Sequence, residues 1–411
     1  NDGSVKGWGE NNRRQLGDGS NTNRTTMVDC TTWNTLNSGS NKIVRMISRY
    51  SSAYALLNTG ALYFIGINWS DDKWPGGQHL GSQNQFTPGL VKANTNDSLD
   101  GSTDALHVVD IVCSNLTTYI ITKDGHAKGW GSGANNQLSN GSSSGTFGYV
   151  SPIQTDSSGG VLTGCATRGF SVPSTTVTIA YCGYSVIMLK SDQTLVGWGR
   201  NYVGILGTGN ADSITRATAL TLPSGVKVKS LAQQCDSGYS RVMGFISTNN
   251  ELYLAGDSGF KQMLSTHSGS NYGFTKIMDN VFYASISNRA VFVQLNDLTI
   301  KGWGHNSFYH LNTSNTTSYY ADQAITIDLG SDNGLSGGTS STSSNTFSFS
   351  STIETTGKNL VVSGNLTIGD TTNNTTVAAA GSGGALTLTL PSSAGSSGQY
   401  LKTDGSGNLS W

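Results

Sequence analysis

The chain repeats one short pattern, and this repeat restricts the folds open to it. A strand ends in Gly-Trp-Gly, and a Leu follows the second Gly after a polar loop, seven residues later. Four copies have both the Trp and the Leu: Trp8 with Leu16, Trp130 with Leu138, Trp198 with Leu206, and Trp303 with Leu311. Two degenerate copies, around Gly66 and Gly256, lack the Trp. Self-similarity at a spacing of about 50–70 residues indicates a repetitive architecture.

Apolar strands and turns surround each copy. The stretches YIITKDGHAKGWG (119–131) and VFVQLNDLTIKGWG (291–304) each read as strand, polar turn and strand, which predicts a hairpin. A further strand precedes the hairpin, as in HVVDIVCSN (107–115) and VKSLAQQCDSGYS (228–240). A short segment such as TTMVD (25–29) supplies a fourth. Four antiparallel strands repeated around an axis form a β-propeller blade.

We therefore predict an all-β protein in which residues 1–330 form a propeller of six to seven four-stranded blades. Only three Glu occur in the chain, while turn-forming Gly is abundant at 53 residues, so helices should be scarce. The first unit lacks its first two strands, which either lie upstream of Asn1 or are replaced by another segment. The repeated tryptophans should pack between adjacent blades and the repeated leucines against the returning loops: Trp8, Trp130, Trp198, Trp303, Leu16, Leu138, Leu206 and Leu311.

The amino-acid composition changes after residue 330. Residues 331–346 are rich in Gly, Ser and Thr and are predicted to be a flexible linker. Residues 347–411 alternate small polar and aliphatic residues, with a hairpin predicted at Thr403–Asn408. This segment has too little apolar bulk for a core of its own. We predict a β-rich stalk that oligomerises or packs on a neighbouring domain.

Charge and residue types exclude several functions. A formal net charge of −1 with 12% charged residues argues against nucleic-acid binding, which needs a clustered basic surface. No apolar run reaches the roughly 18 residues that a membrane-spanning helix needs. The six histidines have no metal-binding spacing, and no phosphate-binding loop occurs. We expect no catalytic residues, metal or cofactor, and hence no enzyme.

The best binding candidate is an insertion in the second unit. Trp69 and Trp74 flank Asp71 and Asp72 there, and aromatic faces beside carboxylates suit sugars. Alternatively, one or both tryptophans simply cover the edge of the blade, and this is the favoured interpretation. A second candidate is the long Gly/Ser-rich excursion at 139–175, which could decorate one face of the propeller.

The repeats resemble those of the regulator-of-chromosome-condensation family over about residues 1–330. Cys113, Cys182-Gly183 and Cys235 match its inner-strand cysteine, and Gln15-Leu16-Gly17 and Gln137-Leu138 match its Gln-Leu-Gly element. The resemblance implies a propeller, usually of seven blades. The family's histidine before the Ala-Leu strand is missing here, and its exchange-factor and chromatin activities are not implied. Cys30 and Cys165 have no place in this pattern.

The carboxy-terminal segments GNLTIGD (364–370) and GQYLKTDGSGNLSW (398–411) resemble parts of tail-fibre and structural proteins of tailed bacteriophages. That resemblance implies intertwined, often trimeric β-stalks and a chain that continues beyond Trp411. We hypothesise a virion or extracellular structural protein in a phage tail fibre. Its partners would be its own copies, other virion proteins and a glycan or protein receptor on the host surface. The alternative is a bacterial surface adhesin or filament subunit assembled by β-strand addition. An exchange factor or chromatin binder is a third, less favoured hypothesis.

Overall fold

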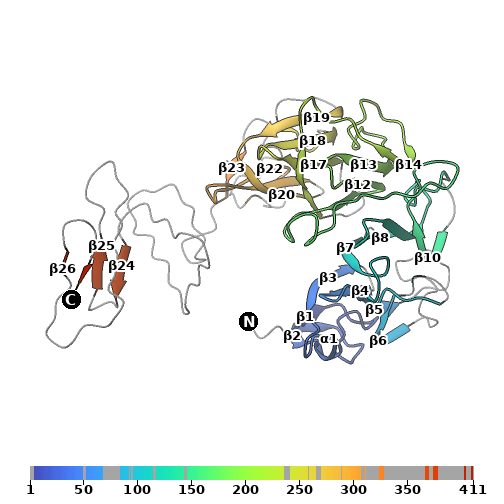
Figure 1. Ribbon diagram of the computed structural model, residues 1–411, viewed down its shortest axis with the longest axis horizontal. Helices are drawn as coiled ribbons and strands as arrows, with labels where there is room; N and C mark the ends of the chain where they lie inside the picture. Colours follow the sequence, from blue (N-terminus) through green and yellow to red (C-terminus); the bar gives the residue numbers. More distant parts are fainter. Residues whose placement is uncertain are drawn as a thin grey trace. The chain divides into compact units, whose positions relative to one another are not determined.

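In the computed structural model, the regular secondary structure of the described residues is almost entirely β-strand, with one short helix (Figure 1). It divides into two compact units, Asn1–Ser341 and Thr342–Trp411. The predicted linker, 331–346, lies outside the described residues and its boundaries stay predictions. The structure describes residues 4–49, 52–67, 84–91, 93, 96–113, 117–142, 146–235, 241–257, 259–264, 270–287, 289–306, 311, 324–327, 366–369, 374–377, 402–403 and 409–410.

Six sheets follow one another along the first unit, and we number them blades 1 to 6 in chain order. Blade 1 contains β1 (Lys6–Gly9) and β2 (Arg24–Asp29). Blade 2 contains β3 (Ile43–Arg49), β4 (Ser52–Leu57), β5 (Leu62–Ile67) and β6 (Asn84–Leu90). Blade 3 contains β7 (Val108–Cys113), β8 (Thr117–Thr122), β9 (Ala127–Ser132) and β10 (Thr146–Pro152).

The remaining blades continue the pattern. Blade 4 contains β11 (Ile179–Cys182), β12 (Ser185–Leu189), β13 (Leu195–Gly199) and β14 (Ile214–Ala219). Blade 5 contains β15 (Val228–Leu231), β17 (Val242–Ser247), β18 (Leu252–Asp257) and β19 (Ser270–Met278). Blade 6 contains β20 (Val281–Ser287), β21 (Ala290–Leu295), β22 (Ile300–Gly304) and β23 (Ile325–Thr326), together with β16 (Gln233–Cys235).

Figure 1 shows the blades in chain order along an arc, with first strands such as β3 and β7 toward its middle and last strands such as β6, β10 and β14 on the outside. Successive strands within a blade pair antiparallel, except for β16, which pairs in parallel with β20, and β7 contacts both β3 and β11 in the neighbouring blades. This arrangement is that of a β-propeller and confirms the predicted fold class. Among the described strands, none of blade 1 pairs with one of blade 6.

The hairpins form because each tight turn holds one residue with a left-handed backbone. Gly60 (φ +82°) and Gly125 (φ +79°) have this conformation in blades 2 and 3, and Asn250 (φ 61°) has it in blade 5. Asp192 closes the turn of blade 4, since its carboxylate accepts the backbone N–H of Thr194 at 3.0 Å. Gly125 lies in the polar turn of the hairpin predicted at 119–131, and Gly, Asn and Asp are the residue types that favour such turns.

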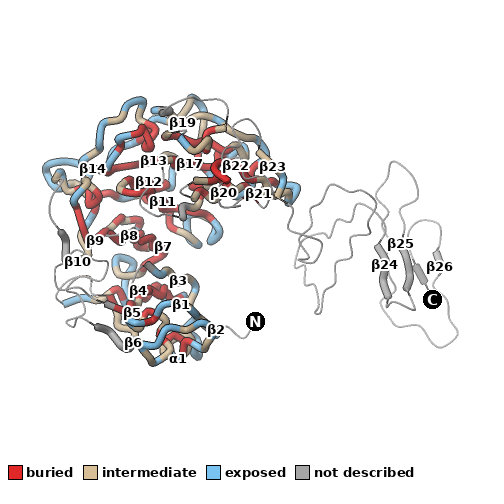
Figure 2. The backbone as a smooth tube through the Cα atoms, turned by 180° about the vertical axis from the view of Figure 1, so that it is seen from behind, coloured by how far each residue is buried: buried red, intermediate tan, exposed pale blue. Residues whose placement is uncertain are grey.

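The buried tryptophans of blades 3, 4 and 6 pack against the preceding blade. Trp130, Trp198 and Trp303 are fully buried. The indole N–H of Trp198 donates to the backbone carbonyl of Gln137 in the preceding blade at 2.6 Å, and Trp303 does the same to Gln262 at 2.7 Å. Figure 2 shows that buried residues concentrate along the middle strands of the blades. The repeated leucines are buried in three of the four copies: Leu138, Leu206 and Leu311.

Trp8 departs from the predicted core position. Its side chain is 62% exposed, and Leu16 is half-buried. The physical reason is the direction of packing. Each buried indole contacts the preceding blade, and no described blade precedes blade 1 in chain order. The same three residues, Gly-Trp-Gly, therefore give a core residue in one blade and a surface residue in another.

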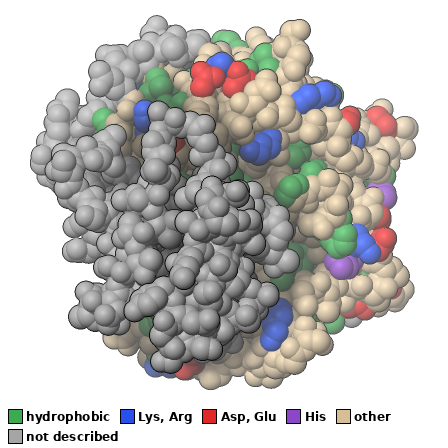
Figure 3. Space-filling view, turned by 60° about the vertical axis from the view of Figure 1, so that its left-hand side comes forward, with side chains coloured by type: hydrophobic (Ala, Val, Ile, Leu, Met, Phe, Trp, Pro, Cys, Tyr) green, Lys and Arg blue, Asp and Glu red, His purple; other side chains and the backbone are tan. Residues whose placement is uncertain are grey.

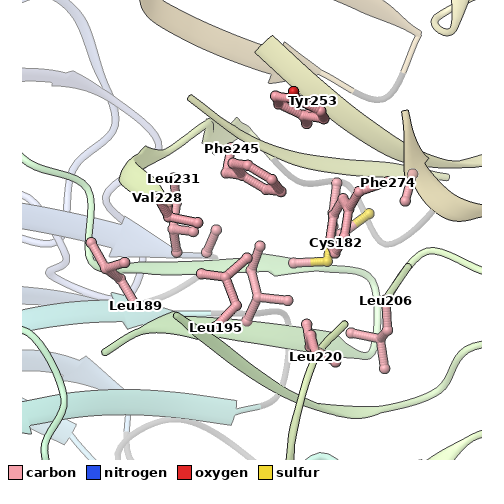
Figure 4. Packing of buried hydrophobic residues seen from close by; sticks show 14 of the residues in the cluster. Cys182, Leu189, Leu195, Leu206, Leu220, Val228, Leu231, Phe245, Tyr253 and Phe274 are labelled. Carbon is pink, nitrogen blue, oxygen red and sulfur yellow. The ribbon is translucent and has the colours of Figure 1, made fainter. Parts of the chain in front are cut away.

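Other side chains fill the place of the Trp in the degenerate copies. Ile65 has this position in blade 2. It packs with Trp33, which belongs to the helix α1 (Thr31–Leu36), and with Cys30, which directly precedes that helix. Ala255 has it in blade 5, where Phe245 stacks on Tyr253 with ring centroids 5.1 Å apart. Figure 4 shows Phe245 beside the side chains of blade 4 in this cluster.

The predicted first strand at 228–240 is divided in the structure. β15 pairs with β17 in blade 5, and β16 leaves that blade to pair in parallel with β20 of blade 6. The change occurs at Ala232, whose N–H donates to the carbonyl of Gly244 at 2.9 Å. The parallel pairing gives hydrogen-bond partners to backbone groups at the inner edge of blade 6, which would otherwise be unpaired.

The second unit contains two short hairpins among its described residues. β24 (Leu366–Gly369) pairs with β25 (Asn374–Val377), and β26 (Lys402–Thr403) pairs with β27 (Leu409–Ser410). The second hairpin is the one predicted around Thr403–Asn408. A two-stranded hairpin is at best marginally stable alone in water.

Candidate functional site

The insertion singled out by the sequence lies between the third and fourth strands of blade 2. Its residues Trp69, Asp71, Asp72 and Trp74 fall outside the described residues, so the proposed sugar site there stays a prediction. The excursion at 139–175 is largely described. Its last part forms a loop, Ala166–Thr176, that lies over the junction of blades 2 and 3 and lines a cavity there.

This junction cavity has a volume of about 280 Å³. Its apolar lining comes from the first strands of blades 2 and 3 and from the second strand of blade 2: Val44, Val108, Val109, Leu56 and Leu57. Its polar and aromatic lining comes from four separate segments: Arg45, Asn58, His107, Arg168, Phe170 and Ser174.

A buried carboxylate positions the two arginines of the cavity. Asp110 on β7 is 1% exposed and forms ion pairs with Arg45 on β3 and with Arg168, the latter at 3.6 Å. The hydroxyl of Thr178, just before β11, donates to the other carboxylate oxygen. Neither arginine side chain is fully buried, with side-chain exposures of 19% for Arg45 and 27% for Arg168. Two arginines and one aspartate leave one positive charge in excess.

Short hydrogen bonds fix the loop that carries Arg168 and Phe170. The backbone N–H of Thr167 donates to Oγ of Ser171 at 2.7 Å, and the N–H of Gly169 donates to the carbonyl of Val172 at 2.8 Å. Nε of Arg168 donates to the carbonyl of Ser174. Local side chains thus hold the turn, and the ring of Phe170 is left 55% exposed.

His107 forms a second aromatic wall. Its ring meets Phe170 edge-on, with centroids 5.6 Å apart and an interplanar angle of 86°. A Cβ on Gly60 would lie 2.3 Å from the imidazole, so the close approach of this ring requires glycine there. Burial, and secondarily the Lys123 ammonium, lowers the pKa of His107 below its ordinary value of 6.5, so the imidazole is neutral at pH 7.

The chemistry of the cavity is that of anion recognition. Arginine does not lose its proton in proteins and presents several N–H donors in a rigid fork suited to carboxylates. A neutral imidazole can donate one hydrogen bond and accept another. Within the described part of the chain, no cluster of three or more His, Cys, Asp or Glu could hold a metal ion.

The cysteines that had no assigned role are packing residues. Cys30 and Cys165 are both 2% exposed. Burial raises the pKa of Cys30 to about 11 and that of Cys165 to about 12, so both are thiols at neutral pH. A protonated, buried thiol is a poor nucleophile and metal ligand. Cys113 and Cys182 are buried on first strands, as predicted, whereas the side chain of Cys235 is outside the described set.

Sequence reasoning missed a set of buried asparagines that organise the loops after the repeated tryptophans. In WGEN, WGRN and WGHN the Asn lies three residues after the Trp. Oδ1 of Asn201 accepts the N–H of Leu206 at 2.9 Å, and its amide donates to the carbonyl of Asn210 at 3.0 Å. The repeated spacing is the signal that could have identified Asn11, Asn201 and Asn306.

Among the described residues visible in Figure 3, the Lys and Arg side chains (blue) and the Asp and Glu side chains (red) are scattered and form no patch of one sign. In the described residues, no helix is long and apolar enough to cross a membrane.

No model of a known protein family matches the sequence. Several solved structures are similar in fold. Yeast RCC1 (Prp20), solved bound to Kap60, matches with a TM-score of 0.58 and 17% identity over 81% of this chain and 72% of that one. Prp20p from Saccharomyces cerevisiae, described with its binding to Gsp1p and histones, matches with a TM-score of 0.58 and 16% identity over 81% and 74%.

Human WBSCR16 matches with a TM-score of 0.50 and 15% identity over 69% of this chain and 65% of that chain. At these identities the likeness concerns the fold alone, and it agrees with the blades described above. The chain is a β-propeller whose fold is similar to that of yeast RCC1.

Proposed function

We propose that the chain is a non-enzymatic structural and binding protein of an extracellular assembly, and specifically part of a phage tail fibre or a related virion appendage. The propeller would contact the host surface, and the second unit would join copies of the chain, in a trimer, and other virion proteins. The observation that carries this proposal is the second unit. Its described strands make only two-stranded hairpins, and its sequence resembles phage stalk segments.

The propeller supports a role in binding. Of the similar solved structures, yeast RCC1 (Prp20) is bound to Kap60, and Prp20p is described with its binding to Gsp1p and histones. A propeller exposes its loops on two faces and can bind without catalytic groups. We extend to this chain only that mode of action, because the charge balance of −1 differs from that of a nucleic-acid-associated protein.

A second candidate is a surface adhesin or filament subunit that assembles by β-strand addition. Blade 1 favours it, because this blade has two strands in the structure and the other blades have four or five. A strand from another molecule could pair with such a sheet through backbone hydrogen bonds.

The mass in solution of the full chain and of residues 1–341 tests both candidates. We expect an oligomer for the full chain and a monomer for residues 1–341, measured by sedimentation velocity at micromolar concentration. If residues 1–341 still oligomerise, strand addition between propellers is the better explanation. A full chain that stays monomeric at these concentrations would overturn the proposed function.

A further inference from the structure

We infer that the junction cavity between blades 2 and 3 is a binding site for one carboxylate-bearing sugar unit, the class that includes the hexuronic acids. The inference goes beyond the proposed function, because the cavity lies within one propeller and would bind its ligand in a monomer or an assembly. A negative result here therefore leaves the test by oligomeric state unaffected.

The charge of the cavity favours a singly charged anion. Arg45 and Arg168 share Asp110, and this group keeps one positive charge in excess. The neighbouring Lys123 adds no further net charge, because its ammonium group pairs with the carboxylate of Asp104 at 2.8 Å. The single negative charge of a carboxylate neutralises the excess positive charge of this cluster, whereas a phosphate dianion carries one negative charge too many.

Arg45 and Arg168 are held in position and keep N–H groups with which they can donate hydrogen bonds to a ligand. Asp110 and the carbonyl of Ser174 occupy only a minority of the ten N–H donors of Arg45 and Arg168. Because both side chains are fixed before a ligand arrives, little side-chain entropy is lost on binding. Arginine forks of this kind can bind a carboxylate in a bidentate manner.

The rest of the cavity suits a sugar ring. The ring of Phe170, with the Lys123 ammonium 5.3 Å from its centroid, belongs to a residue that is 55% exposed, and Val44 has an exposed aliphatic side chain. The C–H face of a pyranose can pack against these two residues. The neutral imidazole of His107 can exchange hydrogen bonds with sugar hydroxyls. A volume of about 280 Å³ fits one ring-sized unit, since pockets for larger ligands begin at roughly 300 Å³.

Titration calorimetry on the full chain with D-glucuronate, D-glucose and inorganic phosphate tests the inference. We expect glucuronate to bind with a dissociation constant in the millimolar range, at least about 10-fold tighter than glucose or phosphate, which is the size of effect a charged hydrogen-bonded pair gives. Equal binding of glucose and glucuronate would overturn the inference. Tighter binding of phosphate would also overturn it and indicate an inorganic-anion site.

Variants locate the site. Arg168→Gln should weaken glucuronate binding about 10-fold or more, and Phe170→Ala should weaken it about threefold, as expected for loss of a charged hydrogen bond and of an aromatic contact. Matched controls are Arg200→Gln and Phe282→Ala, at an arginine and an exposed phenylalanine outside the cavity. Arg45 is left intact because its removal would strand the buried Asp110. Phe170 is exposed, so Phe170→Ala should fold, and unchanged binding in this variant would contradict the inference.

Discussion

At the scale of single residues, the environment decides what a repeated residue does. Trp8 and Trp198 each lie between two glycines in the same Gly-Trp-Gly pattern. Trp198 is fully buried and donates its indole N–H to Gln137 at 2.6 Å, whereas Trp8 is 62% exposed. The hydroxyl of Tyr119 donates to the same carbonyl at 3.0 Å, so one backbone acceptor joins two blades.

Replacing these tryptophans by Phe should therefore have unequal effects. Trp198→Phe removes a buried hydrogen bond and leaves a void, and we expect the free energy of unfolding to fall by about 2–4 kcal/mol. Trp8→Phe removes neither and should change it by less than about 0.5 kcal/mol. Urea unfolding followed by circular dichroism measures both. Equal effects of the two substitutions would contradict the packing described for the blades.

At the scale of elements, the hairpins could be predicted because their causes are local. Turn residues, alternating apolar strands and Gly-Trp-Gly all lie within a few residues of one another. The division of residues 228–240 into β15 and β16 could not be predicted in this way, because its partner strand, β20, begins at Val281. The side chains that fill the place of the missing tryptophans could not be predicted for the same reason. Trp33, for example, lies 32 residues before Ile65, with which it packs.

Glycines after the tryptophan position show how tightly neighbouring strands meet. Gly199 has φ +100°, and a Cβ there would lie 2.1 Å from the carbonyl oxygen of Tyr184. Gly209 also has a positive φ, +83°, but a Cβ there would meet no atom within 4 Å. Substituting alanine at the two positions therefore separates two costs. At Gly209 only the backbone conformation is unfavourable, whereas at Gly199 the added Cβ also overlaps a neighbouring atom.

Gly199→Ala should lower the free energy of unfolding by at least about 3 kcal/mol, from unfavourable backbone conformation and steric overlap together. Gly209→Ala should lower it by about 1–2 kcal/mol, from the backbone conformation alone. Thermal and urea unfolding of the two variants provide the comparison. A smaller loss for Gly199→Ala than for Gly209→Ala would show that β12 and β13 do not approach as described.

At the scale of the molecule, the sequence predicts the order of the blades but not the cavity between them. Arg45, His107 and Arg168 belong to no recurring pattern and come from three segments about 60 residues apart. Only the excursion at 139–175 pointed toward this place. The propeller brings these residues together, because the first strands of neighbouring blades lie side by side near its middle. Asp110 then joins three blades, through Arg45 in blade 2, its own strand in blade 3 and Thr178 beside blade 4.

This connection makes a buried ion pair important to the whole propeller. Arg45→Met would leave the carboxylate of Asp110 buried without its nearest cation, with the Thr178 hydroxyl, the backbone N–H of Ile111 and the more distant Arg168 as partners. We expect a loss in the free energy of unfolding of about 3 kcal/mol or more. The control is Lys6→Met, which breaks the pair of Lys6 with Asp29, whose side chains are about half exposed; it should cost less than about 1 kcal/mol.

Unfolding in urea at low and high sodium chloride separates the two pairs further. Salt screens exposed charges over roughly 10 Å at 0.1 M but affects buried pairs much less. The effect of Lys6→Met should therefore shrink as salt rises, whereas that of Arg45→Met should persist. If both effects disappeared in high salt, Asp110 would be accessible to solvent, and it could not be the residue that holds blades 2, 3 and 4 together.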